Sequence, residues 1–403
     1  MRVLYILPAE GFGGAERQGV VHVANLPRLG IEVVAAAGPG QPICTQLARA
    51  GVDDFLFCQD LPRAATPSAG LAGRLGRPFQ YLRSWSRSVR ALTSLGRRRA
   101  VDVVFASRTF GWVVGSAVAR RLGVPVLWRA GSQPSRAAHT FALRYLAPLI
   151  APDLLVANSE LGCRTYAGLL HVPTAVLRNG VDTERFSPGR ARQRLRHELG
   201  FGMAPVVGLA ARPAPEKGLD CFARIAQTVG RAIPSVRFLI AGDFPLRARY
   251  QESFAAQGLA ERVTFLGHVD DVESFYASCD VVVLTSGRQS IEMSSNAILE
   301  AMSTARPVVV TNVGGMTEAV RDGVDGFVVA PDDPASFSQR LSLLLANPEL
   351  RRHFGDAARR RILAHYSQAR VVADLAELLT LACRRESKPA PQSLVARAHK
   401  EAS

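Results

Sequence analysis

Lysine is nearly missing from this chain of 403 residues. Only three of its 49 basic residues are lysines (Lys217, Lys388 and Lys400), so arginine carries almost all of the net charge of +15. Arginine suits phosphate groups because its planar guanidinium donates two parallel hydrogen bonds. The composition therefore indicates either an anionic partner or a genome that encodes arginine in place of lysine. Lys217 is the only lysine in the first 387 residues, which makes it a candidate for a specific role.

Paired cysteines and long apolar runs are missing too. The six cysteines are spread singly without a C-x-x-C pair, which argues against a disulfide framework or a zinc site. The first apolar run ends at Pro8 and is too short for a signal peptide. The most apolar long stretch, residues 141–159, contains an arginine, two prolines and an aspartate, which a bilayer span does not tolerate easily. We therefore expect a cytoplasmic protein, at most bound to the inner face of the plasma membrane.

Short apolar runs alternate with helix-length amphipathic segments along most of the chain. Strands are predicted in the first half at 3–7, 32–38, 55–58, 101–107, 124–128, 153–159 and 175–177, and in the second half at 206–211, 236–242, 263–267, 280–286, 307–312 and 326–329. This alternation predicts an α/β fold with two Rossmann-like, doubly wound domains. Ligands bind at the carboxyl ends of parallel strands, so functional residues are expected just after strands, facing a cleft between the domains.

The domain boundaries follow from breaks in this pattern. The run from Phe186 to Gly189 contains Pro188 and stops regular structure, so we predict one domain at 1–188 and a second at 189–366. A last amphipathic helix is predicted at 367–385. The final segment, 386–403, is predicted to be a flexible tail.

Two loops at strand ends contain groups that could bind an anion. Arg212 and Lys217 bracket a loop that leads into a helix, and two neighbouring cations favour an anion such as a diphosphate between them. Gly13 and Gly14 lie between the first strand and a helix, where bare backbone amides can approach an anion. The dinucleotide fingerprint is not met, because Glu16 occupies its third glycine position. A plain turn at the glycines and a solvated loop at the cations remain alternatives.

The stretch from Ser286 to Val320 places one glutamate on each side of a helix start. Glu292 precedes the predicted helix, which Ser295 or Asn296 could cap, and Glu300 lies about one turn inside it. The exposed amides of such a helix can hold phosphate oxygens, and each carboxylate can accept hydrogen bonds from vicinal sugar hydroxyls. The alternative is one capping residue and one surface glutamate.

With these residues assembled, the chain resembles the GT-B-fold glycosyltransferases of family 4, which are retaining enzymes that use nucleotide sugars. The resemblance covers about residues 1–385 and is carried by an ordered set of motifs: GGAER (13–17), ANSELGCRTY (157–166), VLRNGVDTERFSP (176–188), ARPAPEKGLD (211–220), VTFLGHVDDVESFYASCDVVVLTS (263–286), Glu292-x7-Glu300 and EAMSTARPVVVTNVGGMTEAVRDGVDGFVV (300–329).

The resemblance implies roles for the matching positions. Arg212 and Lys217 would neutralise the donor diphosphate, and Glu292 would bind hydroxyls of the transferred sugar. Glu300 would bind the ribose. The backbone of Gly267, His268 and Val269 would read the base, the amides near Ser294, Ser295 and Asn296 would hold phosphate oxygens, and Gly13 and Gly14 would line the cleft. Asn179 to Asp182 would form the interdomain join, and the helix at 367–385 would cross back to the first, acceptor-side domain.

Some positions depart from the family pattern. Many relatives have a histidine near the reacting sugar, after the strand that matches residues 124–128. Here Arg129 stands at about that place and is our candidate for the role, with His139 ten residues later. Met293 replaces a frequent glycine after the first glutamate, and Ala305 replaces another before the strand at 307–312.

The resulting hypothesis is a retaining glycosyltransferase that moves a sugar from a nucleoside diphosphate sugar to a lipid-linked or cell-envelope glycan. It implies no tightly bound cofactor and no essential metal, since the pairs Asp270-Asp271 and Asp332-Asp333 suit loop or cap positions better than a D-x-D metal site. Alternatives are a non-catalytic nucleotide-sugar-binding subunit or sensor, and a GT-B-type sugar-nucleotide epimerase. Nucleic acid is not expected as a partner, because no aromatic residues interleave with the basic ones.

The basic segment 78–99 offers a second contact. Phe79, Leu82, Trp85, Val89 and Leu92 form one stripe of a predicted helix, with arginines around it. Such a helix could lie on an anionic membrane and bring a lipid-linked acceptor to the cleft. In the alternative interpretation, the stripe packs on the sheet.

Overall fold

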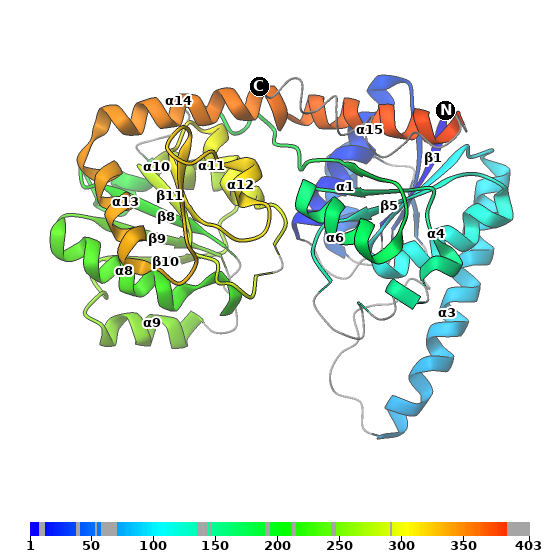
Figure 1. Cartoon of the computed structure of the whole chain (residues 1–403), viewed down its shortest axis with the longest axis horizontal. Coiled ribbons are helices and arrows are strands. Elements are labelled where there is room, and N and C mark those ends of the chain that lie inside the picture. Colours follow the sequence, from blue (N-terminus) through cyan, green and yellow to red (C-terminus); the bar gives the residue numbers. More distant parts are fainter. Residues whose placement is uncertain are drawn as a thin grey trace. The chain divides into compact units, whose positions relative to one another are not determined.

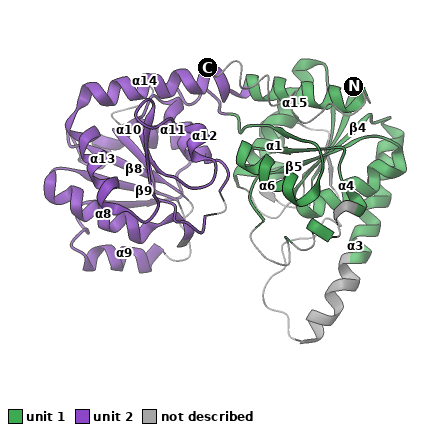
Figure 2. Ribbon diagram, viewed as in Figure 1, with its two compact units in different colours: residues 1–180, 369–403 green, residues 181–368 purple. Residues whose placement is uncertain are grey.

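The computed structural model describes residues 1–7, 13–37, 41–52, 55–57, 71–134, 140, 143–145, 147–189, 194–211, 215–242, 247–290 and 292–384. These residues form two compact units, shown in different colours in Figure 2. Unit 1 consists of Met1–Gly180 together with the chain from Ala369 onward, and unit 2 is Val181–Gln368. The predicted tail, 386–403, lies outside the described residues.

The chain divides at 180/181, and not at the 188/189 expected from the sequence. Residues 181–188 belong to unit 2 because their contacts are there. The amide of Val181 donates to the carbonyl oxygen of Tyr366 (2.8 Å), and the carbonyl oxygen of Val181 accepts from the amide of Gln368 (2.9 Å). Phe186 is 6% exposed and belongs to a core cluster of unit 2. Pro188 and Gly189 therefore follow the boundary and do not mark it.

Unit 1 is built on a seven-stranded parallel sheet in the order β3-β2-β1-β4-β5-β6-β7 (Figure 1). The strands are β1 (Arg2–Leu7), β2 (Glu32–Ala37), β3 (Phe55–Phe57), β4 (Val103–Ser107), β5 (Val126–Ala130), β6 (Leu154–Ala157) and β7 (Thr174–Val176). The central strands β4 and β5 are buried along their whole length, as expected for strands covered on both faces.

Helices cover this sheet and complete its core. They are α1 (Gly14–Asn25), α2 (Gln41–Arg49), α3 (Leu71–Arg98), α4 (Arg108–Leu122), α6 (Glu160–Leu170) and α15 (Gln368–Cys383), with short 3-10 turns at η1 (Leu26–Leu29) and η2 (Ala147–Ile150). The last helix, α15, packs into the same buried cluster as α1 and α2 through Val371, Val372, Leu375 and Leu379. The end of the described chain therefore belongs to the core of the first unit.

Unit 2 repeats the arrangement with a six-stranded parallel sheet in the order β10-β9-β8-β11-β12-β13. The strands are β8 (Val206–Ala210), β9 (Arg237–Ala241), β10 (Val263–Gly267), β11 (Val281–Leu284), β12 (Val308–Thr311) and β13 (Gly326–Val329). The helices are α7 (Arg194–Glu198), η3 (Pro215–Lys217), α8 (Leu219–Ala232), α9 (Arg247–Ala256), α10 (Val272–Ser278), α11 (Asn296–Ser303), α12 (Met316–Ala319), α13 (Pro334–Ala346) and α14 (Pro348–His365).

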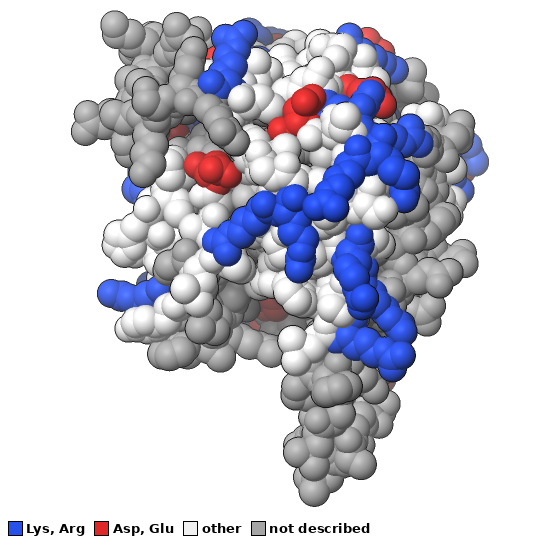
Figure 3. Space-filling view, turned by 90° about the vertical axis from the view of Figure 1, so that its right-hand side faces the viewer, with Lys and Arg blue, Asp and Glu red and all other residues white. Residues whose placement is uncertain are grey.

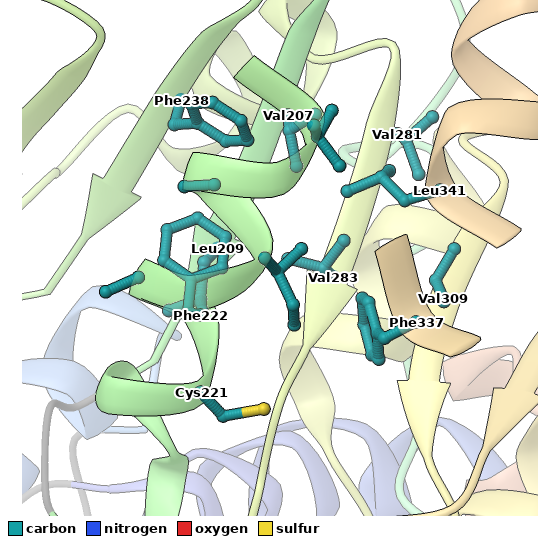
Figure 4. Close-up of a cluster of buried hydrophobic side chains, with 14 of the residues drawn as sticks. Val207, Leu209, Cys221, Phe222, Phe238, Val281, Val283, Val309, Phe337 and Leu341 are labelled. Carbon is teal, nitrogen blue, oxygen red and sulfur yellow. The ribbon is translucent and has the colours of Figure 1, made fainter. Parts of the chain in front are cut away.

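One core cluster of unit 2 lies between the sheet and the helices α8 and α13. Figure 4 shows Phe222 of α8 and Phe337 and Leu341 of α13 against valines and leucines of β8 and β11. Each of these three side chains is at most 1% exposed. Burying a side chain of this kind contributes about 1.5–3 kcal/mol, so this layer fixes the two central strands. The carboxyl ends of those strands are consequently held on a rigid support.

The sequence prediction of the fold is confirmed. Each of the thirteen predicted strands is present, with ends that differ by a few residues at most. All the described strand pairings are parallel, so the α/β class with two Rossmann-like domains holds. The predicted last helix is α15.

The helix predicted at 78–99 is buried in its second half. Val89 and Leu92 of α3 are at most 1% exposed, so this part of the stripe packs inside unit 1, where α3 lies against α4. Leu82 is 62% exposed. The side chain of Phe79 lies outside the described residues.

Candidate functional site

Each sheet has a point where the strand order reverses direction, and this is where open α/β sheets bind ligands. In unit 1 the reversal lies between β1 and β4, and in unit 2 it lies between β8 and β11. Lys217 follows β8 and Glu292 follows β11, so both stand at the carboxyl edge beside this point in unit 2.

Lys217 and Glu292 form an ion pair. The ammonium nitrogen Nζ of Lys217 donates to Oε2 of Glu292 at 2.6 Å, and the two side chains are 15% and 18% exposed. The resemblance implies separate roles for these residues, toward diphosphate and toward sugar, and the structure brings them together. A cation and a carboxylate side by side can contact adjacent parts of one ligand, namely an anionic group and a hydroxyl.

Gly218 explains how the chain holds Lys217 in this place. Its φ of +68° is in the left-handed region, and a Cβ there would lie 1.9 Å from the carbonyl oxygen of Thr285. The hydroxyl of Thr285 donates to the carbonyl oxygen of Lys217 at 3.0 Å. The loop after β8 therefore lies directly on the end of β11, and only glycine permits this approach.

Gly314 holds Glu292 in place, as Gly218 does for Lys217, by permitting a close approach of two backbone segments. The glycine has a φ of +57°, and a Cβ there would lie 1.5 Å from the carbonyl oxygen of Glu292. It belongs to the Gly-Gly turn that follows β12, the strand next to β11. Gly314 thus supports the backbone of Glu292, a role that was not identified from the sequence.

The helix α11 begins close to this pair along the chain. Ser295 stands at its N-cap position, is 4% exposed, and accepts no hydrogen bond there through its side chain, so the predicted cap bond is not formed. Asn296 is the first helical residue, and Ser294 lies just before the cap. Glu300 accepts a hydrogen bond from the hydroxyl of Tyr276 at 2.9 Å, which orients its carboxylate. Tyr276 was not identified from the sequence.

The loop proposed to read a base lies after β10. Gly267 has a φ of +72°, and a Cβ there would lie 2.6 Å from Nη1 of Arg247. His268 is largely exposed, with its Nε2 atom 3.2 Å from Oδ1 of Asp270. Val269 packs against a core cluster of unit 2. A nucleotide at this loop remains a prediction.

Other predicted residues fall into two groups. Arg212 and His139 lie outside the described residues. Asp271 and Asp333 are helix caps, accepting from the amides of Ser274 (3.1 Å) and Ser336 (3.0 Å), as the sequence indicated. Their carboxyl pKa values are lowered, first of all by the hydrogen bonds from those same serine side chains.

In unit 1 the glycine turn meets a buried carboxylate. Gly13 precedes α1, which begins at Gly14, and its amide donates to Oε2 of Glu16 at 2.8 Å. The other oxygen of Glu16, which is 3% exposed, accepts from Nε of Arg108 at 2.7 Å. Arg108 follows β4 and has a φ of +61°, a conformation that is uncommon without glycine and recurs at functional sites. Arg108 was not identified from the sequence, although a charged residue directly after a strand was the available signal.

Arg129 is buried at the end of β5, and the structure does not place it in an open position. Its side chain is 5% exposed. Nη2 donates to Oδ1 of Asn179 (3.0 Å), and Nη1 lies 3.1 Å from the imidazole nitrogens of His22. These contacts tie α1 and the segment that leads to unit 2 onto the sheet. They favour a positioning role, whereas the predicted contact with a sugar remains untested.

Burial controls the electrostatics around Arg129. The pKa of His22 is well below its usual value of 6.5, first because the ring is buried and second because of the Arg129 charge. Tyr5 is hydrogen-bonded to His22 (2.9 Å), and burial raises the pKa of Tyr5 to about 12. Both groups are therefore neutral near pH 7.

The sequence comparison finds a family match in the second unit. Residues 204–347 match the family model of glycosyl transferases group 1. The resemblance seen in the sequence is confirmed. The putative glycosyltransferase EpsD of Bacillus subtilis is 32% identical over 49% of this chain and 52% of its own length.

A second relative has a more specific name. The GDP-mannose-dependent alpha-(1-6)-phosphatidylinositol monomannoside mannosyltransferase of Mycolicibacterium smegmatis is 32% identical over 56% of this chain and 59% of its own length. The chain thus spans about half to six tenths of the curated relatives that it matches.

A solved structure covers more of the chain. The Anabaena protein Alr3699/HepE in complex with UDP matches 94% of this chain and 100% of its own, with a TM-score of 0.77 and 21% identity. At this identity the likeness shows the fold, which is GT-B. Within the described part of the chain, no helix combines the length and apolar composition needed to cross a membrane.

Proposed function

We propose that the chain is a retaining glycosyltransferase that moves a sugar from a nucleoside diphosphate sugar to a lipid-linked or cell-envelope glycan. The observation that carries this proposal is the Lys217–Glu292 pair at the reversal point of unit 2. The family match of residues 204–347 supports the reaction class. The UDP-bound Anabaena structure, which shares this fold, supports a nucleotide-sugar donor.

In this proposal the main contribution of the protein is to stabilise the leaving group. Negative charge grows on the diphosphate as the glycosidic bond breaks, and a positioned ammonium stabilises that charge more than it stabilises the intact donor. Lys217 supplies this charge, together with Arg212 and the first amides of α11. Glu292 accepts hydrogen bonds from the sugar, and Glu300 accepts them from the ribose. Departure of the diphosphate on the face where the acceptor attacks gives retention.

The acceptor and the place of reaction belong to the same proposal. One relative is named for a phosphatidylinositol-linked acceptor, which supports a lipid-linked glycan here. We place the reaction in the cytoplasm at the inner face of the plasma membrane, with α3 as the membrane contact.

The test is the Lys217→Ala variant. Turnover should fall by at least about 100-fold, the loss typical of removing one preorganised group that stabilises developing charge. The assay measures product from a panel of UDP- and GDP-sugars with a polyprenyl-diphosphate-linked acceptor. It is run in EDTA, because the proposal assigns charge neutralisation to side chains and not to a metal.

The matched control is Arg231→Ala, which removes an exposed cation from the last turn of α8 in the same unit. Its turnover should equal that of the wild type, and both variants should keep the wild-type circular dichroism spectrum. Normal turnover by Lys217→Ala would refute the proposal. Donor binding without transfer to any acceptor would instead favour the non-catalytic sensor.

A further inference from the structure

The positive charge of this chain is concentrated in one segment. Residues 61–152 contain fifteen arginines and a single acidic residue, Asp102, which gives a net charge of +14. The whole chain has +15, so the remaining 311 residues are nearly neutral. An arginine-rich genome alone would spread the excess evenly. The concentration of positive charge in residues 61–152 is therefore a local property of this segment and not a result of the overall composition.

The described arginines of this segment lie mostly on the outside of unit 1. Arg83, Arg87 and Arg90 are exposed on α3, while Val89 and Leu92 point into the core. Arg83, Arg87 and Arg90 are spaced by four and three residues, which puts them on one side of the helix. Figure 3 looks onto the side of unit 1 that carries α3 and α4, and its blue side chains gather into a run with few red ones.

A second group of exposed arginines stands where α3 and α4 end. These are Arg97 and Arg98 on α3, and Arg120 and Arg121 on α4. The two helices pack together, since a Cβ on Gly96 of α3 would lie 2.5 Å from Leu122 of α4. Arg97 stands two helical turns after Arg90, on the same side of α3. The arginines of both helix ends and the row Arg83, Arg87 and Arg90 therefore belong to one surface, which we call the basic face.

Large apolar side chains are exposed in the same segment. Leu82, Tyr145 and Leu149 are 62%, 59% and 68% exposed. A side-chain nitrogen of Arg120 donates to the carbonyl oxygen of Leu149, which places that leucine beside the basic face. Exposed arginine next to exposed leucine suits a surface that presents both phosphate groups and acyl chains.

We infer that the basic face docks on a membrane surface rich in anionic phospholipids. Its arginines bind lipid phosphates, and Leu149 enters the headgroup boundary. The contact differs from the one expected from the sequence, in which the stripe containing Val89 and Leu92 would enter the membrane. Those residues are in the core, so the opposite, arginine-bearing side of α3 makes the contact. This inference adds a lipid class to the proposed function and does not depend on catalysis.

The test is flotation of the full chain with vesicles of phosphatidylcholine, with and without phosphatidylglycerol, at low and high salt. Binding should require phosphatidylglycerol and weaken with salt, because salt screens charge at the surface. The variant R83Q/R87Q/R90Q should reduce partitioning by about 100-fold, equivalent to about 3 kcal/mol, since each basic residue near an anionic surface contributes about 1 kcal/mol.

The matched control is R231Q/R352Q/R360Q, which removes three exposed arginines from unit 2 and causes the same loss of charge. It should partition like the wild type. Equal binding of neutral vesicles, unchanged binding by R83Q/R87Q/R90Q, or equal loss in both triple variants would overturn the inference. Tighter binding of single-stranded RNA than of anionic vesicles would overturn it as well.

A donor titration separates this inference from the proposed function. UDP and GDP binding, measured by calorimetry, should be the same in the wild type and in R83Q/R87Q/R90Q. If the wild type binds vesicles but no nucleotide, the proposed glycosyltransferase function is contradicted. If it binds nucleotide but no vesicles, the proposed membrane docking of the basic face is contradicted.

Discussion

Replacing Gly314 by alanine should disable Glu292 without touching its side chain. The added Cβ would lie 1.5 Å from the carbonyl oxygen of Glu292, and real Cβ atoms essentially never come nearer than 3.0 Å to such an atom. One of the two backbones must therefore shift by about 1.5 Å. A shift of that size is enough to break the 2.6 Å contact between Lys217 and Glu292.

The magnitude follows from two costs. An alanine at a φ of +57° costs about 1–2 kcal/mol, and overpacking against a backbone adds about 1–3 kcal/mol. The free energy of unfolding should fall by about 2–5 kcal/mol in urea denaturation. Turnover of the sugar donor should fall by about 100-fold, the effect expected when a catalytic group is misplaced by about 1 Å.

Gly323→Ala is the matched control, because Gly323 has a φ of +73° and nothing within 4 Å of its Cβ position. It should cost only the 1–2 kcal/mol, roughly, of the left-handed backbone and leave turnover unchanged. Equal loss of stability in the two variants, together with normal turnover by Gly314→Ala, would refute the argument that Gly314 supports Glu292.

Two further predictions concern buried groups. His22 has a folded pKa well below 6.5, so the unfolded state binds the proton first and stability must fall as pH drops below about 6.5. Between about pH 6.5 and pH 5.5 this costs about 1 kcal/mol, and urea unfolding of His22→Gln should lack that loss. Burial raises the pKa of the Cys279 thiol to about 12, so the native protein at pH 8 should not be alkylated there. Mass spectrometry should find the label on Cys279 only after unfolding, and rapid native labelling would contradict its burial.

The fold could be predicted from the sequence because parallel strands covered on both faces appear as short, wholly apolar runs. Runs such as the one that forms β11 are wholly apolar and are bounded by polar or glycine residues. The domain boundary was less clear, since Pro188 and Gly189 are strong breakers but the pairing of Val181 with Ser367 comes from distant parts of the chain.

For the site, the sequence supplied residues but not their contacts. Lys217 stood out because lysine is scarce, and Glu292 because of its spacing from Glu300. Their pairing depends on two tight loops that are shaped by Gly218 and Gly314, and a glycine in a sequence does not show which backbone it will approach. Testing the individual roles still requires the variants described above.

Arg129 is a second residue whose contacts could not be predicted from the sequence. Its position after a strand suggested a group that faces the substrate. In a buried strand, however, alternate side chains enter the layers on either side, and the acceptors for Arg129 come from α1 and from Asn179. These acceptors are far away in the sequence, and no local pattern predicts them.

The return of α15 to unit 1 has a consequence for biosynthesis. Unit 2 is one continuous stretch of chain, whereas unit 1 needs both its first 180 residues and a helix that begins at Gln368. Domains generally fold as units while the nascent chain leaves the ribosome. Unit 2 can therefore finish folding before unit 1. Until α15 has been synthesised, the apolar surface of unit 1 that Val371, Leu375 and Leu379 cover stays exposed. During that interval the incomplete protein exposes apolar surface and can aggregate. A premature stop codon before Gln368 would therefore leave an aggregation-prone fragment.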